Sequence, residues 1–126
     1  MQLNQITVPV RDVIQSIGFY EKLGLVLIVA STPHYARFVC PNGEATFSLH
    51  EVAELGSGEG VWVYFEVENV EEKVKNLVDK GLTFEELPND KPWLWREARL
   101  KDLDNNQIII YHAGENRLNP PWKIRA

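Results

Sequence analysis

The sequence predicts an α+β fold made of two tandem β-α-β-β-β units. The main observation is an internal repeat, because residues 5–25 correspond to residues 62–82 when the chain is shifted by 57 positions. The matched positions are Val10 with Val67, Val13 with Val70, and Gly24-Leu25 with Gly81-Leu82. In both segments a β-branched stretch precedes apolar residues that recur at helical spacing. A shared period of this kind indicates one supersecondary unit built twice.

The first unit is expected to occupy residues 1–51. Alternating and β-branched residues predict strands at 3–10, 25–30, 34–40 and 45–50. A helix is predicted from Val13 to Leu23, with Asp12 as its N-cap and Gly24 as the residue that ends it. The order of these elements is therefore β-α-β-β-β.

A glycine-rich linker at residues 51–60 precedes the second unit, which is expected to occupy residues 61–113. The strands predicted in this unit are 61–67, 82–87, 95–101 and 107–112. Asn69 is predicted to cap a helix that runs to about Lys80, and residues 88–92 (Pro-Asn-Asp-Lys-Pro) are predicted to form a loop. Residues 114–126 form a C-terminal arm beyond the repeat, and residues 1–126 form one domain.

The composition excludes several classes of function. The chain has 126 residues, of which 44% are hydrophobic, and its net charge is −5, which is ordinary for one globular domain. It has neither a basic stripe nor an apolar run of membrane-spanning length, so we expect no nucleic-acid partner and no membrane partner. Cys40 is the only cysteine, which excludes an internal disulfide. No secretory signal is visible, so a cytoplasmic location is expected.

Strand alternation predicts which side chains point away from the helix of each unit. Two curved sheets, each covered on one face by its own helix, are expected to form an open, barrel-like curved sheet around a cleft. The side chains expected to line this cleft are Gln5, Thr7, Ser48 and His50 in the first unit and Trp62, Tyr64, Glu66, Ile109 and Tyr111 in the second. Such a lining suits a small organic ligand. The alternative is that the aromatic side chains simply fill a core.

Three motifs resemble those of a known family. They are V-P-V-R-D-V at 8–13, F-Y-E-K-L-G-L at 19–25 and D-L-D-N-N-Q-I-I-I at 102–110. Together with the paired units, they resemble the vicinal oxygen chelate superfamily, which includes glyoxalase I, bleomycin-resistance and fosfomycin-resistance proteins, and extradiol dioxygenases. The resemblance covers roughly residues 1–113 and implies a homodimer.

The resemblance also implies where a divalent metal would be held, with one ligand on the first and one on the last strand of each unit. These positions map to Gln5, Ser48, Trp62 and Ile109, or to Ile110 in place of Ile109 if a 62-residue shift applies to the back half of the repeat. An indole and an alkyl group offer no lone pair to a metal, and a serine hydroxyl is a poor ligand. We therefore expect no metal and no other cofactor.

The function expected from these features is metal-free binding of a small molecule, in the manner of bleomycin-resistance proteins. The ligand, aromatic or partly apolar, would be held in the cleft between the two units. The predicted ligand contacts are Gln5, Thr7, Ser48, Trp62, Tyr64, Tyr111 and Arg37. Arg37 is included because its guanidinium would clamp a carboxylate or phosphate. Trp93, Trp95 and the segment Pro120-Pro121-Trp122 are expected either to cover the cleft or to lie at a subunit contact.

Two alternatives remain open. In the first, the protein is a lyase, isomerase or dioxygenase of the glyoxalase superfamily with an atypical or absent metal site, and His50 or Glu66 transfers a proton. In the second, the pocket is filled and the surface mediates association. The corresponding structural interpretations place His50 half in water at the end of a strand and Arg37 on a solvated strand face.

Overall fold

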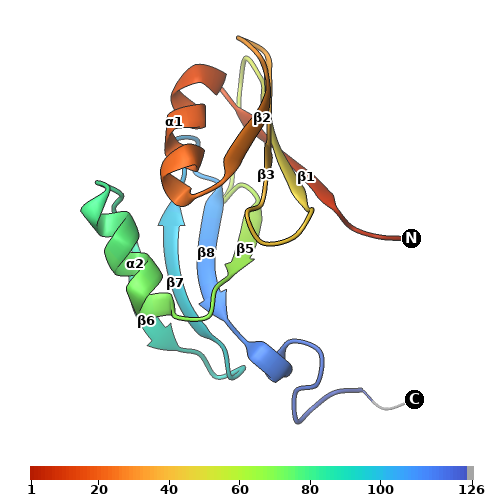
Figure 1. Cartoon of the computed structure of the whole chain (residues 1–126), viewed down its shortest axis with the longest axis vertical. Coiled ribbons are helices and arrows are strands. Elements are labelled where there is room, and N and C mark those ends of the chain that lie inside the picture. The colour runs from red at the N-terminus through yellow and green to blue at the C-terminus, as the bar shows by residue number, and fades with distance from the viewer. Residues whose placement is uncertain (125–126) are drawn as a thin grey trace. The chain divides into compact units, whose positions relative to one another are not determined.

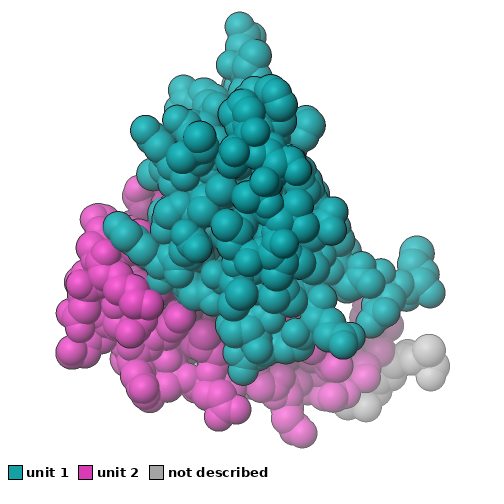
Figure 2. Space-filling model, turned by 45° about the horizontal axis from the view of Figure 1, so that its top comes forward, with its two compact units in different colours: residues 1–61, 102–106 teal, residues 62–101, 107–126 magenta. Residues whose placement is uncertain are grey.

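The predicted repeat is present in the structure. The computed structural model describes residues 1–124, and the chain divides into two units, which Figure 2 colours separately. The first unit comprises Met1–Val61 and Asp102–Asn106, and the second comprises Trp62–Lys101 and Gln107–Ala126. Each unit has four strands and one helix in the predicted order β-α-β-β-β, so the α+β class is confirmed.

Figure 1 shows the elements of the first repeat in red to yellow and those of the second in green to blue. The elements of the first repeat are β1 (Gln5–Val10), α1 (Val13–Leu23), β2 (Val26–Ser31), β3 (Tyr35–Val39) and β4 (Thr46–Glu51). The elements of the second are β5 (Trp62–Glu66), α2 (Val70–Asp79), β6 (Glu86–Asp90), β7 (Arg96–Lys101) and β8 (Gln107–His112). A short 3-10 helix, η1 (Gly114–Asn116), begins the C-terminal arm.

Both helices begin where the sequence predicts. The Asp12 carboxylate accepts a hydrogen bond from the Gln15 backbone amide at 3.0 Å, and the Asn69 side chain accepts one from the Glu72 amide at 3.0 Å. These bonds satisfy amides that have no partner within the helix. Gly24 then ends α1 with a φ of 113°, a left-handed conformation that favours glycine. Neither α1 nor α2, the helices of the described residues 1–124, combines the length and apolar character that a membrane span requires.

The two sheets have the same topology. Their strand orders are β1-β4-β3-β2 and β5-β8-β7-β6. In each sheet the first and last strands of the unit pair in parallel, and the remaining pairs are antiparallel. Gln5 and Trp62 are therefore equivalent, since each begins the first strand of its unit.

The strand register corrects one detail of the predicted repeat. Thr7 lies opposite Ser48, and Tyr64 lies opposite Ile109, so β4 and β8 correspond with a shift of 61 rather than 62 positions. The reason is the preceding turn, which spans residues 40–45 in the first repeat but only residues 102–106 in the second. As a result, the equivalent of His50 is Tyr111, and the equivalent of Ser48 is Ile109 rather than Ile110.

The prediction for residues 82–92 was also wrong. The segment 88–92 was expected to be a loop, but β6 runs from Glu86 to Asp90 and includes Pro88. Proline is tolerated here because β6 is the edge strand and its pairing with β7 is irregular between Glu86 and Asn89. The amide that Pro88 lacks therefore removes no regular ladder hydrogen bond.

The core of the first unit centres on Tyr20. Its side chain is fully buried, and its ring lies 4.7 Å from the ring of Phe47 and 6.0 Å from that of Phe38. Its hydroxyl donates a 2.6 Å hydrogen bond to the buried carboxylate of Asp102. Burial and then the charge of Asp102 raise the pKa of Tyr20 well above its ordinary value, so the hydroxyl keeps its proton and remains a donor.

Asp102 also organises the turn to which it belongs. Its carboxylate accepts hydrogen bonds from the Asp104 amide at 2.8 Å, the Asn106 amide at 2.9 Å and the Asn106 side-chain amide at 2.8 Å. The Asn106 side chain donates in addition to the Pro9 carbonyl at 3.2 Å, and Arg11 pairs with Asp104 at 3.0 Å. Residues 102–106 therefore belong to the first unit by packing, although they follow β7 in the chain.

In the second unit, α2 covers one face of the sheet. The buried side chains of α2 are Val70, Val74 and Leu77. The buried apolar side chains of the same unit on the helix-covered face of the sheet are Val63, Ala98, Leu100, Ile108 and Ile110. Because side chains alternate along a strand, the residues between these positions point to the opposite face.

The C-terminal arm is fixed to the second unit by Glu66. One carboxylate oxygen accepts hydrogen bonds from the amides of Ala113 and Gly114 at 2.8 and 2.9 Å, and the other lies 3.8 Å from Nε of Arg117. Burial alone would raise the pKa of Glu66, but the two amides, His112 and Arg117 outweigh it and hold the pKa below its ordinary value. The first residues of the arm are therefore bound by the Glu66 carboxylate in its ionised form.

Tyr20→Phe removes the hydroxyl and leaves one bond to the buried Asp102 carboxylate unmade. We expect the free energy of unfolding to fall by about 1–3 kcal/mol, measured by urea denaturation. Tyr64→Phe is the control, because Tyr64 is 41% exposed, and a change of less than about 0.5 kcal/mol is expected there. An equal fall in the free energy of unfolding of the two variants would show that the bond between Tyr20 and Asp102 has no special role in stability.

Glu66→Gln removes a charge whose pKa is lower in the folded state than in the unfolded chain. Ionised Glu66 therefore stabilises the folded protein above its ordinary pKa of 4.5, and this contribution is lost as the pH falls through the folded-state pKa. We expect Glu66→Gln to be less stable than the wild type at about pH 7 and closer to it at about pH 3.5 in urea denaturation. The exposed Glu44 provides the control substitution Glu44→Gln, and a pH-independent gap between Glu66→Gln and the wild type would contradict the assignment.

Candidate ligand-binding site

The free face of the first sheet is polar. Strand pairing places Thr7 opposite Ser48, Arg37 opposite Ser48, and Tyr35 opposite His50. Gln5 lies two residues before Thr7 on β1 and therefore shares this face, while the buried side chains of Val8, Phe38, Phe47 and Leu49 point to the face that α1 covers. The structure thus puts Gln5, Thr7, Ser48, His50 and Arg37 on one face, and their roles in binding or catalysis stay predictions.

Hydrogen bonds join most of this polar face into one network. The Gln5 amide nitrogen donates to the Ser48 hydroxyl at 2.7 Å and to the Thr7 hydroxyl at 3.1 Å. Ser48 is fully buried and bonds in turn to the Tyr35 hydroxyl at 2.8 Å, which accepts from Nε of Arg37 at 2.9 Å. Sequence analysis missed Tyr35, although its spacing of two residues from Arg37 placed it on the same face.

The network changes the acidity of Tyr35. Burial alone would raise the pKa of the Tyr35 hydroxyl, but its hydrogen bonds with Ser48 and Arg37, together with the Arg37 charge, lower the pKa below its ordinary value. The Arg37 guanidinium carbon also lies 5.4 Å from the centre of the Tyr35 ring. Arg37 is therefore held in place by its neighbours rather than extended freely into solvent.

The residues at the metal positions of the resembling family do not fit a divalent ion. In the first unit, the Gln5 amide oxygen already accepts a hydrogen bond from the Thr46 hydroxyl, and its nitrogen binds Ser48. In the second unit, the equivalent positions hold Trp62 and Ile109, whose side chains carry no metal ligand. Within residues 1–124, no group of three or more His, Cys, Asp or Glu side chains is arranged to hold a metal.

The free face of the second sheet is aromatic. Tyr111 is buried, and its ring stacks on that of Trp95 with 4.8 Å between centroids and an interplanar angle of 27°. Tyr64 meets both rings edge to face, at 5.4 Å from Tyr111 and 5.9 Å from Trp95. These three rings form a continuous aromatic surface on the side of the sheet away from α2.

A pocket of about 570 Å³ opens on this aromatic surface. Its lining residues are Tyr64, Trp93, Trp95, Asn116, Arg117, Pro120 and Trp122. The sheet and the β6–β7 connection supply three aromatic walls, and the C-terminal arm supplies the rest. Of the predicted ligand contacts, this pocket includes Tyr64, with Tyr111 stacked on Trp95.

The pocket is lined by residues for which the sequence analysis left two roles open. Trp93, Trp95 and the segment 120–122 were expected either to cover a cleft or to lie at a subunit contact, and in the structure they line a pocket of their own unit. The structure fixes Trp95 through a hydrogen bond from its indole nitrogen to the Asn116 carbonyl at 3.3 Å. The sequence signal for this pocket was the density of tryptophan and proline near the end of the chain.

Trp62, Glu66 and His50 lie outside the residues that line this pocket. Trp62 is 45% exposed, and the Arg99 guanidinium carbon lies 5.7 Å from the centre of its ring. Glu66 holds the C-terminal arm, and its lowered pKa makes it a weak base. His50 is exposed on β4 in the first unit. A catalytic role for His50 or Glu66 stays a prediction.

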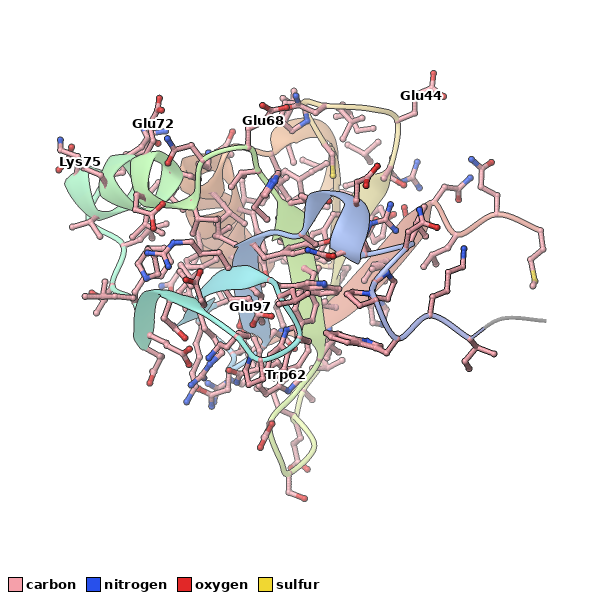
Figure 3. All side chains as sticks on the ribbon, turned by 90° about the horizontal axis from the view of Figure 1, so that it is seen from below. Glu44, Trp62, Glu68, Glu72, Lys75 and Glu97 are labelled. Atoms are coloured by element: carbon pink, nitrogen blue, oxygen red, sulfur yellow. The ribbon has the colours of Figure 1, made fainter. Side chains whose placement is uncertain are left out.

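Glu97 places a buried carboxylate beside the aromatic surface. It lies on β7 opposite Tyr111, is only 6% exposed, and accepts a 2.6 Å hydrogen bond from the indole nitrogen of Trp93. Burial and then the charge of Glu97 raise the pKa of Tyr64, while the charge of Lys91 acts in the opposite direction. Figure 3 shows Glu97 among closely packed side chains, whereas Glu72 and Lys75 project outward from α2.

Comparison with known proteins identifies the family. The sequence profile of the Glyoxalase/Bleomycin resistance protein/Dioxygenase superfamily matches residues 2–110. The chain is 33% identical over 127 residues to the uncharacterized protein YraH of Bacillus subtilis (strain 168), with 88% of this chain and 98% of that protein covered.

Two solved structures share the fold. A glyoxalase/bleomycin resistance protein/dioxygenase from Nocardioides has a TM-score of 0.80 at 21% identity, with 99% of this chain and 90% of that chain covered. TnmS3, an antibiotic binding protein from Streptomyces sp. CB03234, has a TM-score of 0.75 at 19% identity, with 90% of this chain and 96% of that chain covered. With the paired β-α-β-β-β units and the profile match, these findings show that the chain belongs to the Glyoxalase/Bleomycin resistance protein/Dioxygenase superfamily.

Proposed function

We propose that this protein binds a small, planar and partly apolar organic molecule without a metal, and that the aromatic pocket of the second unit holds it. The observation that carries this proposal is the pocket of about 570 Å³ lined by Tyr64, Trp93, Trp95 and Trp122. Its volume falls within the range of small-molecule sites, and four aromatic side chains supply the apolar contact that such sites use.

The polar residues of the pocket have the placement that orientation of a ligand requires. Asn116 and Arg117 belong to the arm, so they face the aromatic walls that the sheet contributes. A few polar groups on an otherwise apolar lining fix the orientation of a ligand and add specificity. The binding energy comes mainly from ring contact and burial.

The pocket walls are held in place before a ligand arrives. Trp95 is stacked on Tyr111, and its indole nitrogen donates to the Asn116 carbonyl. These two contacts restrict the rotation of its side chain. The arm is anchored by the bonds from Ala113 and Gly114 to Glu66. Walls that are already ordered lose little conformational entropy on binding, which favours affinity.

Four further predictions belong to this proposal. Gln5, Thr7, Ser48 and Arg37 are proposed as polar ligand contacts of the first unit, because their network presents fixed donors on a free sheet face. The metal-free character rests on the donor chemistry of Gln5, Ser48, Trp62 and Ile109. A homodimer and a cytoplasmic location are proposed as well, and light scattering of the purified protein measures the oligomeric state.

The family supports small-molecule binding as the general activity. TnmS3 shares the fold and is an antibiotic binding protein. At 19% identity this likeness concerns the fold, so the choice of the second-unit pocket depends on the residues of this chain and not on the relative.

Trp122→Ala removes one aromatic wall on the exposed arm and should weaken binding without disturbing the sheet. We expect quinoline, acridine or 1-naphthol to bind with 1:1 stoichiometry in isothermal titration calorimetry, and the affinity to fall about ten-fold in Trp122→Ala, because one aromatic face contributes roughly 1–2 kcal/mol. Leu118→Ala is the matched control, since Leu118 lies on the same arm, is 62% exposed and does not line the pocket.

Trp62→Ala tests whether the ligand binds in the aromatic pocket or at Trp62, the contact that the sequence predicted. If Trp62→Ala lowers the affinity and Trp122→Ala does not, the ligand binds at Trp62, the residue that the sequence predicted, and not in the proposed pocket. Failure of all three aromatics to bind the wild type with a Kd below about 1 mM would overturn the proposed function.

A further inference from the structure

We infer that the aromatic pocket selects organic cations, and that the buried carboxylate of Glu97 supplies the opposite charge. This inference rests on the proposed function and names the chemical class of its ligand. The structural observation is a carboxylate that is 6% exposed and hydrogen-bonded to the Trp93 indole, beside a pocket in which four of the seven lining residues are aromatic.

Glu97 has a hydrogen-bond partner but no positive partner in the part of the chain that the structure describes. Among residues 1–124, no Lys, Arg or His nitrogen lies within 4.0 Å of its carboxylate oxygens. The indole of Trp93 satisfies one oxygen but leaves the charge uncompensated. An ionised carboxylate in a position this buried is costly unless a cation is near, so the site gains from a ligand that brings one.

Two of the positive groups near the pocket, Arg117 and Lys91, are matched by other carboxylates. Arg117 lines the pocket, but its Nε lies 3.8 Å from Glu66, which is held in its ionised form by the arm amides. Lys91 pairs with Glu86. Neither of these two groups compensates the charge of Glu97, which is therefore available to a cationic ligand.

The aromatic walls favour the same sign of charge. The faces of indole and phenol rings carry negative partial charge, so a cation placed over them is attracted, and indole is the strongest of the common rings. Three of the four aromatic residues in the lining are tryptophans: Trp93, Trp95 and Trp122. An anion would meet ring faces and a carboxylate, whereas a cation gains from both.

The net charge of the chain acts in the same direction. At −5 it raises the local concentration of small cations at the surface. This long-range field does not select a site, but it increases the rate at which a cationic ligand meets the pocket, and salt reduces the effect.

The first test compares probes that share a ring system and differ in charge. At about pH 8, isothermal titration calorimetry on the wild type should show N-methylquinolinium binding about ten-fold more tightly than neutral quinoline, with 1-naphthoate weaker than both. This comparison needs no variant, so it remains decisive even if substitution of the buried Glu97 impairs folding.

The second test removes the charge of Glu97 and keeps its shape. Glu97→Gln retains an oxygen that accepts from the Trp93 indole, so the pocket wall is preserved. We expect the preference for N-methylquinolinium over quinoline to fall to about two-fold. Glu72→Gln is the matched control, because it changes the net charge equally from an exposed position on α2 and should keep the wild-type preference.

The outcomes separate the two proposals. If quinoline and N-methylquinolinium bind equally, or if 1-naphthoate binds best, the cation inference is overturned while small-molecule binding in the pocket stands. If the preference persists in Glu97→Gln, Glu97 is not its source and the inference is again overturned. If none of these probes binds, and acridine and 1-naphthol do not bind either, the proposed function fails together with the inference.

Discussion

In each unit a single helix covers one face of a four-stranded sheet, and alternation along the regularly paired strands assigns their side chains to one of two environments. Val8, Leu49 and Phe47 pack on the helix side of the first sheet and are buried, while Gln5, Thr7 and Ser48 point the other way. The same division in the second sheet separates Ile108 and Ile110 from Ile109 and Tyr111. The side chains that can contact a ligand therefore lie on the uncovered faces, where packing against the helix does not restrict residue type.

The two repeats use this freedom differently. Equivalent positions hold Gln5 and Trp62, Thr7 and Tyr64, Ser48 and Ile109, and His50 and Tyr111. The first face is a hydrogen-bonded polar network, and the second is an aromatic surface on which the arm builds a pocket. Two similar backbones thus carry different side chains. The first sheet presents hydrogen-bond donors and acceptors, and the second presents aromatic rings and a buried carboxylate.

Much of this arrangement could be predicted from local signals. Capping by Asp12 and Asn69, the left-handed Gly24 and the 57-residue period depend on short stretches of chain, and all of them are present in the structure. Pro88 misled the prediction because proline usually excludes a strand, and only the edge position and irregular pairing of β6 make it acceptable. The pocket could not be predicted, because Trp93, Trp122 and Glu97 are brought together by the path of the arm and by one buried hydrogen bond, neither of which leaves a periodic pattern.

The turn at residues 102–106 belongs to the second repeat by sequence and to the first unit by packing. The corresponding turn of the first repeat, residues 40–45, contains no aspartate that could take the place of Asp102. A fragment ending at residue 61 would thus lack the acceptor for the phenol of Tyr20 and the amide group that reaches Pro9. The first unit therefore depends on a turn supplied by the second repeat, so residues 1–61 cannot be excised with their core intact.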